Sequence, residues 1–186
     1  MRDKSDDELV ARAQQGEVSA IGYLYDRHRD SIFRYLWLRL DERQLAEDLT
    51  GDVFMRMLDA LPRYRMQGLP FRAWLYRIAH NLLVDYVRKL NRQATVPLDA
   101  VEEQGLEDDP GDTIDQVLLS ERLRVALLRL EPTQCEVVIL RFLAGLSLQE
   151  TALTLGKTEA AIKALQHRGL SGLRRALEPL EESVTS

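Results

Sequence analysis

Basic and hydrogen-bonding side chains share one face of a helix that is predicted near the C-terminal end of the sequence. They form two adjacent rows at helical spacing: Lys163, His167 and Arg174 in one, and Ala164, Arg168 and Arg175 in the other. Lys and Arg bind phosphate oxygens, and Arg also binds the edge of guanine. This face therefore has the chemistry needed to position and read duplex DNA.

The helix belongs to a helix-turn-helix pattern. Residues 147–150, SLQE, form a capping box that begins a short helix, Gly156 ends it, and Thr158 can cap the next helix. In such a pair the second helix enters the major groove. A plain helical hairpin with a solvated outer face is the alternative interpretation.

A second group of residues interleaves aromatic and basic side chains on a helix predicted at 71–92. Its members are Arg72, Trp74, Tyr76, Arg77, His80, Asn81, Tyr86, Arg88, Lys89 and Arg92. Such a mixture suits single-stranded nucleic acid, because bases stack on the rings and cations neutralise the backbone. Trp74 and Tyr86 also fall on the apolar row of the helix, so we expect these two rings in the core.

A third group is acidic and lies opposite the apolar stripe of a helix predicted at 45–61. Its members are Glu47, Asp48, Asp52 and Asp59, with Gly51 among them. A solvated face is the ordinary interpretation, and a docking surface for a basic partner is the sharper one.

Residues for catalysis or metal binding do not come together in the sequence. His28, His80 and His167 lack metal-ligand spacing, and there is neither a Gly-rich phosphate loop nor a Ser/His/Asp arrangement. We expect the single cysteine, Cys135, to be a small buried hydrophobe. The sequence thus predicts a protein that is not an enzyme and that uses no metal or cofactor.

The elements that carry these groups are all predicted to be helical. With 10 Gly and 6 Pro among 186 residues, turn residues are scarce, and no convincing strand pattern is found. We expect an all-α fold of two small domains, at 1–94 and 113–180, joined by a flexible acidic linker at 95–112. Residues 61–97 carry a net charge of +6 and residues 98–120 a net charge of −8.

No apolar run is long enough for a membrane span, and the N-terminus is charged rather than signal-like. We therefore expect a cytoplasmic protein with no membrane partner.

Three stretches carry a resemblance to a known family: AEDLTGDVFMRMLDALPRYR, PFRAWLYRIAHNLLVDYVRK and, after the acidic linker, LSLQETALTLGKTEAAIKALQHRGLSGLRR. In this order and spacing, over about residues 5–178, the chain resembles a bacterial extracytoplasmic-function (group IV, sigma-70 family) RNA polymerase sigma factor. The resemblance implies sigma region 2 at 1–94 and sigma region 4, with its helix-turn-helix, at 113–180.

The resemblance also implies partners and sites. The partners are core RNA polymerase, met at the clamp helices of its largest subunit and at its beta flap, then promoter DNA, and also an anti-sigma factor. The polymerase site is Glu47, Asp48 and Asp52; the −10 site is Tyr64, Arg65, Asn81, Asp85, Arg88 and Lys89; the −35 site is Lys163, Ala164, His167 and Arg168. Family members usually carry Gln at the position of Gly51, and glycine inside a helix costs roughly 1 kcal/mol relative to alanine.

The main alternative is a helix-turn-helix transcription regulator that acts without stable association with core polymerase. It would use residues 146–176 alone, with 1–94 as a sensor or dimerisation domain. It leaves the pattern at 71–92 without a role. Such a regulator would bind promoter DNA unaided, whereas a sigma factor should need the core enzyme.

Overall fold

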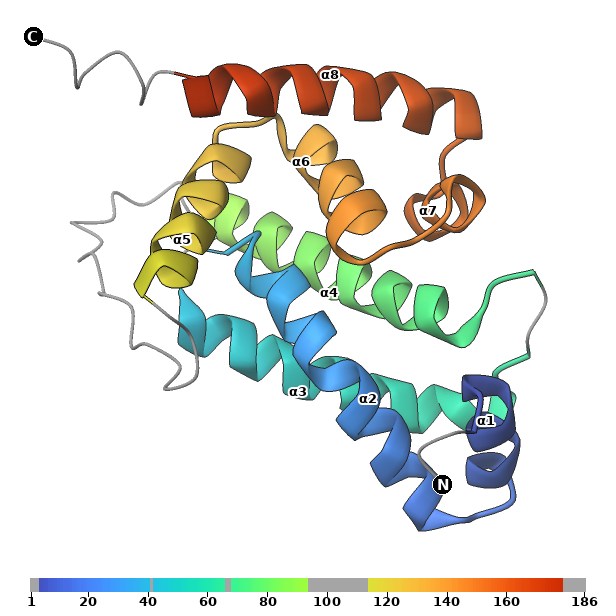
Figure 1. Ribbon diagram of the computed structural model, residues 1–186. Helices are drawn as coiled ribbons and strands as arrows, with labels where there is room; N and C mark the ends of the chain where they lie inside the picture. The colour runs from blue at the N-terminus through green and yellow to red at the C-terminus, as the bar shows by residue number, and fades with distance from the viewer. Residues whose placement is uncertain (1–3, 41, 66–67, 94–113, 179–186) are drawn as a thin grey trace, which may run out of the picture.

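The computed structural model of the protein describes residues 4–40, 42–65, 68–93 and 114–178, and every regular element in these ranges is helical (Figure 1). The predicted all-α fold is confirmed, and the predicted linker at 95–112 lies outside the described residues. The elements are α1 (Asp6–Gln14), α2 (Val18–Trp37), α3 (Arg43–Ala60), the 3-10 helix η1 (Leu61–Arg63), α4 (Phe71–Gln93), α5 (Ile114–Leu128), α6 (Pro132–Val138), the π-helical turn η2 (Ile139–Leu143), α7 (Leu148–Leu155) and α8 (Glu159–Leu177).

Helices α1 to α4 form what we call the N-terminal unit. α3 packs against both α2 and α4, and α1 lies against α2. The apolar stripe predicted along α3 faces inward, with Leu49, Val53 and Met57 buried. Trp74 and Tyr86 pack against the same core, as their place on the apolar row predicts. The opposite faces of α3 and α4 are thereby left to solvent.

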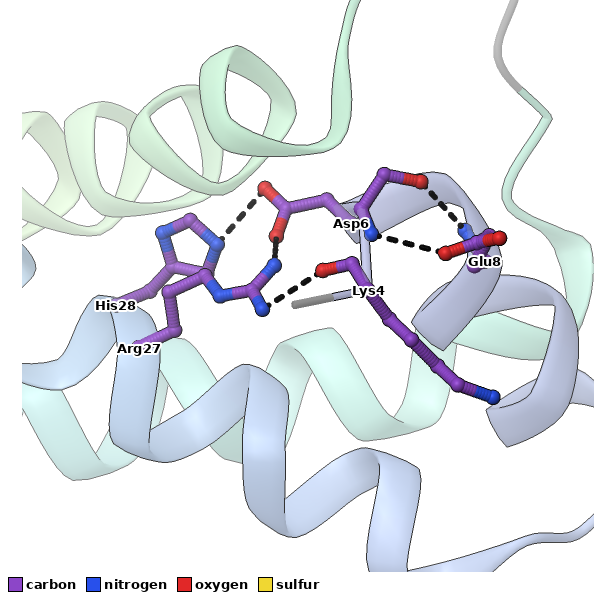
Figure 2. A network of polar contacts seen from close by, with 6 residues as sticks. Lys4, Asp6, Glu8, Arg27 and His28 are labelled. Atoms are coloured by element: carbon purple, nitrogen blue, oxygen red, sulfur yellow. Dashed lines mark hydrogen bonds and ion pairs between the residues drawn. The ribbon is translucent and has the colours of Figure 1, made fainter. Parts of the chain in front are cut away.

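Helix α1 is fixed to α2 by a small network of polar contacts (Figure 2). Asp6 Oδ1 accepts a hydrogen bond of 2.7 Å from Arg27 Nη1, and Asp6 Oδ2 lies 2.9 Å from His28 Nε2. Burial alone would raise the pKa of Asp6, but the contacts with His28 and Arg27 outweigh it and hold that pKa below its ordinary value. The predicted capping box of α1 is present as well, with Ser5 and Glu8 bonded to each other's backbone N–H.

Helices α5 to α8 form what we call the C-terminal unit. Glycines let α8 pack closely against α6 at Gly169 and against Leu130, which precedes α6, at Gly172. A Cβ at Gly169 would lie 2.8 Å from Val138 Cγ2 and 3.1 Å from the Gln134 carbonyl oxygen, and one at Gly172 would lie 2.7 Å from Leu130 Cδ2. No side chain fits at Gly169 without a shift of α6.

The two units share one hydrophobic core. Cys135, Ile139 and Leu140 of the C-terminal unit belong to the same buried cluster as Leu36 and Leu75 of the N-terminal unit. The sequence predicts two domains on a tether, and the structure adds a packed interface between them. A small unit leaves a large share of its apolar surface uncovered, and packing the two together removes part of that surface from water. Cys135 is 1% exposed, so its predicted burial is confirmed.

None of the helices in the described ranges is long and apolar enough to cross a membrane.

Candidate nucleic-acid and polymerase interfaces

The helix-turn-helix is formed by α7 and α8, and the predicted signals mark its ends. Ser147 and Glu150 form the capping box of α7. Gly156 ends α7 in the left-handed conformation, with φ of 62° and ψ of 37°, which favours glycine over other residues. The Thr158 side chain accepts a hydrogen bond of 3.1 Å from Ala161 N at the start of α8. Local sequence therefore fixes the turn.

The outer face of α8 presents the residues that the sequence predicts for DNA. Lys163, Ala164, His167 and Arg168 are all exposed, and Ile162 on the opposite face is fully buried between α7 and α6. Within the described residues no carboxylate pairs with Lys163 or Arg168. Both cations are thus available to phosphate oxygens or base edges.

Arg141 ties α8 to the turn before α7, a role that the sequence analysis did not assign. Its Nε donates a hydrogen bond of 3.0 Å to Gln166 Oε1 on the flank of α8, and its Nη1 donates to the Leu146 carbonyl. A single arginine in an apolar stretch has no sequence signal that would separate this role from a solvated one. Gln166 lies next to the predicted contact residue His167, so the bond limits rotation of the outer face of α8.

The exposed row of α4 carries the residues expected at the −10 element. Asn81, Asp85, Arg88 and Lys89 follow one another along the helix and are all exposed. The buried row of the same helix includes Phe71, Leu75 and Leu82. The structure thus presents the four predicted residues together, on the side of α4 away from the core.

Tyr64, also expected at the −10 element, is buried rather than exposed. Its ring is 8% exposed and packs 4.5 Å from the ring of Trp74 and 5.9 Å from that of Phe71, measured between centroids. Its hydroxyl donates a hydrogen bond of 2.9 Å to the Leu69 carbonyl. Burial and the nearby charges of two aspartates raise the pKa of Tyr64 to about 12. The side chain thus supports the loop, and the DNA contact expected of Tyr64 stays a prediction.

The first part of the loop between α3 and α4 is held by hydrogen bonds from α1, and residues 66–67 at the middle of the loop lie outside the described part of the chain. The Gln14 side-chain amide donates hydrogen bonds of 2.9 Å to the carbonyls of both Leu61 and Tyr64. Arg65, also expected at the −10 element, is exposed and donates hydrogen bonds to the carbonyls of Pro62 and Tyr64. Gln14 was missed because a glutamine at the end of a short helix looks like ordinary surface.

The acidic face of α3 is exposed as predicted. Glu47 Oε1 accepts a hydrogen bond of 3.1 Å from Arg43 Nε, and Asp48 Oδ1 accepts one of 3.0 Å from Gln44 Nε2. Each donor lies one helical turn earlier, and Asp52 is exposed beside these pairs. Sequence analysis overlooked Met55, which is 60% exposed in the next turn of the same surface. The face therefore combines negative charge with one large apolar side chain, a composition suited to protein docking.

Known proteins match both units. A family model described as Sigma-70 region 2 matches residues 24–93, and one described as Sigma-70, region 4 matches residues 126–175. The chain is 43% identical over 174 residues to the ECF RNA polymerase sigma factor BldN of Streptomyces coelicolor, covering 91% of this chain and 65% of that protein. It is 34% identical to SigD of Mycobacterium tuberculosis, covering 90% and 82%, and 33% identical to SigX of Bacillus subtilis, covering 87% and 85%.

Solved structures agree with these matches. CnrH in complex with the cytosolic domain of CnrY superposes with a TM-score of 0.73 at 25% identity, covering 95% of this chain and 99% of that one. RpoE from Bartonella quintana in complex with the anti-sigma factor NepR superposes with a TM-score of 0.70 at 22% identity, covering 83% and 94%, and supports the fold. Together with the helix-turn-helix, the relatives show that this chain belongs to the extracytoplasmic-function sigma factors of the sigma-70 family, non-enzymatic subunits that direct RNA polymerase to promoters and to transcription initiation.

Proposed function

We propose that this sigma factor uses three surfaces: α3 binds core polymerase, α4 with the described residues of the loop before it binds the −10 element, and α8 binds the −35 element. The observation that carries the proposal is the outer face of α8, where Lys163, His167 and Arg168 are exposed on the second helix of a helix-turn-helix. That geometry is the one with which such motifs read duplex DNA.

At the −35 element, Arg168 reads a base and Lys163 binds phosphate. Arg168 lies on the exposed face of α8, where a guanidinium can reach the O6 and N7 atoms of guanine. Lys163 lies five residues earlier and on the neighbouring row, so its ammonium meets the DNA backbone. His167 contributes a further hydrogen bond, and Ala164 leaves room for the close approach of a base.

At the −10 element, Asn81 and Asp85 contact bases of the opened strand, and Arg88 and Lys89 bind its phosphates. The amide of Asn81 both donates and accepts hydrogen bonds, which base edges require. The phosphates of single-stranded DNA need cations along the same track, and the two basic residues follow one turn later. Arg65, in the loop before α4, supplies another cation.

The acidic face of α3 docks on the clamp helices of the largest polymerase subunit. Its charge suits a basic partner surface, and Met55 supplies an apolar contact among Asp48 and Asp52. The C-terminal unit meets the beta flap of the polymerase. We place all of this activity in the cytoplasm, where the polymerase and its promoters are.

A protein of the anti-sigma kind is a further proposed partner. The support is the likeness to CnrH, which was solved with the cytosolic domain of CnrY bound and which matches 95% of this chain. Affinity purification of the full chain from its own cells tests this partner, with a bound protein that is displaced by core polymerase as the expected result. Recovery of the chain with polymerase subunits alone would contradict it.

Run-off transcription with purified core polymerase tests the main proposal. We expect specific transcripts from a library of promoters when the chain is added, and no promoter binding by the chain without the core enzyme. Stable, sequence-specific binding to promoter DNA by the chain alone would contradict it and favour an independent regulator.

The docking surface is tested by charge reversal. Asp48→Lys with Asp52→Lys should weaken association with the core enzyme and leave the melting curve unchanged, because both side chains are exposed. Asp26→Lys with Asp30→Lys on exposed positions of α2 is the matched control. Equal core affinity of the two double variants would place the docking surface elsewhere.

A further inference from the structure

Ala164 differs in chemistry from the other residues expected to face DNA on α8. Lys163, His167 and Arg168 each carry a charged or hydrogen-bonding group, whereas the side chain of Ala164 is a single methyl group. This methyl group is exposed, and it lies one helical turn before Arg168 on the same row. It can neither bind a phosphate nor form a hydrogen bond with a base, so any selectivity at this position comes from apolar contact.

The direction in which Ala164 points is fixed by the opposite face of the helix. Ile162 is fully buried, in one cluster with residues of α6 and α7. Gly169 packs so closely on α6 that a Cβ there would lie 2.8 Å from Val138 Cγ2. Ala164 follows Ile162 by two residues, or about 200° of rotation, and therefore points away from the protein. Figure 1 shows α8 along one edge of the molecule, with its outer side uncovered.

The second turn of α8 is where the helix can approach a base most closely. The N-terminal part of a recognition helix is the part that meets base edges in the major groove. The first turn of α8 carries the exposed carboxylate of Glu159, which repels phosphates. In the second turn Ala164 follows the exposed cation Lys163 and has no side-chain atom beyond Cβ. The short side chain therefore brings the backbone of α8 near the base edges.

Thymine is the base whose edge suits a methyl group. Guanine and adenine present hydrogen-bonding atoms to the major groove, and cytosine presents an amino group. Thymine alone adds an apolar group, the methyl group on its C5 atom, and alanine is one of the residues that contact it. Against the polar edge of another base the methyl group of Ala164 would displace water without replacing its hydrogen bonds, which lowers affinity.

The spacing of Ala164 and Arg168 places the thymine relative to the guanine proposed for Arg168. Four residues correspond to about 6 Å along a helix axis. Successive base pairs of DNA are about 3.4 Å apart. A residue at each of these two positions therefore meets base pairs that are about two steps apart at most, since α8 crosses the groove at an angle rather than following it.

We propose that Ala164 is a specificity-determining residue for the −35 element, and that its methyl group packs against the C5 methyl group of a thymine within about two base pairs of the guanine bound by Arg168. The proposal rests on the proposed function, because it assumes that α8 enters the major groove of this element. Cytosine carries hydrogen at the same ring carbon, so Ala164 distinguishes two pyrimidines of nearly the same shape.

Replacing thymine with deoxyuridine tests the contact, because the two bases pair alike and differ only in this methyl group. The probe is a promoter duplex selected from a −35 library by the wild-type holoenzyme, with each thymine of the element replaced in turn on either strand. We expect one replacement to lower holoenzyme affinity about fourfold, the effect of one buried methyl group. An element without a thymine near the guanine, or equal affinity for every uridine duplex, would overturn the proposal.

Removing the methyl group from the protein should remove the same discrimination. We expect the holoenzyme with Ala164→Gly to bind the thymine and uridine duplexes equally, because glycine has no group to contact the base methyl. Ala160→Gly, at an exposed alanine one turn earlier on the same row, is the matched control and should keep the fourfold ratio. A ratio that persists in Ala164→Gly, or that is lost in Ala160→Gly instead, would overturn the proposal.

A second base pair gives the same contact in the opposite direction. At the position of the sensitive thymine, 5-methylcytosine opposite guanine should bind the wild-type holoenzyme about fourfold better than cytosine opposite guanine. Equal affinity of these two duplexes would show that uridine acts through the DNA rather than through Ala164.

The outcomes separate this inference from the proposed function. If the holoenzyme selects no −35 sequence from the library, the proposed function fails. If it selects an element but accepts uridine in place of every thymine, the role of Ala164 alone fails.

Discussion

The two proposed nucleic-acid surfaces of this protein are held by contacts of different range. The reading face of α8 depends on caps that join residues three positions apart, at Ser147 and Thr158. The loop before α4 depends on Gln14, whose partners Leu61 and Tyr64 lie 47 and 50 residues away. The proposed −35 surface is thus encoded locally, whereas the proposed −10 surface is assembled when α1 docks on the rest of the N-terminal unit.

The largest effect should come from adding a side chain at Gly169, where α8 meets both a side chain and the backbone of α6. Gly169→Val should destabilise the C-terminal unit by about 3 kcal/mol, because its side chain would overlap Val138 and the backbone of Gln134. Gly22→Val in α2, with nothing within 4 Å of its Cβ, is the control. Urea unfolding followed by circular dichroism measures both, and equal stability of the two variants would contradict the close packing of α6 and α8.

Within the −35 surface, base reading should separate from phosphate binding. Arg168→Ala should cost about 1–3 kcal/mol at promoters with the preferred base and flatten the preference at that base. Lys163→Ala should weaken all −35 sequences alike, and Arg122→Ala, an exposed arginine of α5, should change neither. Transcription from a −35 library measures the pattern. A uniform loss in Arg168→Ala would make that residue a phosphate contact.

The long-range hydrogen bonds of Gln14 should matter for the −10 promoter element and not for the −35 element. Gln14→Ala removes two hydrogen bonds to the first part of the loop, so we expect a loss of about 1–2 kcal/mol in promoter opening, with −35 preference unchanged. Gln15→Ala, at the exposed neighbouring position, is the matched control. Permanganate footprinting of the opened strand reports the effect, and an unchanged bubble would show that the loop holds its shape without Gln14.

Acid should loosen the attachment of α1. Because the pKa of Asp6 is below its ordinary value of 3.8 in the folded protein, its stabilising contribution is present above that value and is lost as the pH falls through the lowered one. Asp6→Asn should therefore cost about 1 kcal/mol at pH 7 and almost nothing at about pH 2. Thermal melts of this variant and of Asp7→Asn under both conditions check the prediction. A loss that persists in acid would point to packing rather than charge.

The smallest effect should be at the exposed glycine of α3. No atom lies within 4 Å of the place that a Cβ at Gly51 would take, so Gly51→Ala should stabilise the N-terminal unit by about 0.5–1 kcal/mol. Core affinity should stay the same, because a methyl group adds no charge to the acidic face. A fall in core affinity would show that the polymerase approaches the backbone at this position.

The sequence was sufficient for the parts of the molecule that nearby residues determine. Both capping boxes, the left-handed Gly156 and the helical course of residues 71–93 follow from spacing and residue type. The exposed rows of α3, α4 and α8 follow as well, because a helix that buries one face must present the other. Burial of Cys135 was predictable from its apolar neighbours in the sequence.

The sequence was insufficient wherever a polar group is used at long range. No local pattern predicts that the Tyr64 ring packs against Trp74. Glu136 of α6 looks like one more surface carboxylate in the sequence, yet it is buried. Its hydrogen-bond partners, Tyr35 and His80, lie 101 and 56 residues away. No local pattern distinguishes a buried glutamate from a solvated one when the groups that satisfy it come from another part of the chain.

The π-helical turn η2 has a consequence for which kinds of sequence change the chain can accept. A π-helical turn holds about one residue more than an α-helical turn, and each residue of a helix corresponds to about 100° of rotation. Removing one residue from Ile139–Leu143 would therefore put the following turn out of phase and carry Arg141 away from Gln166. Phe142, which is half exposed, can change its type, but the number of residues in this segment is fixed by the direction in which the recognition helix must point.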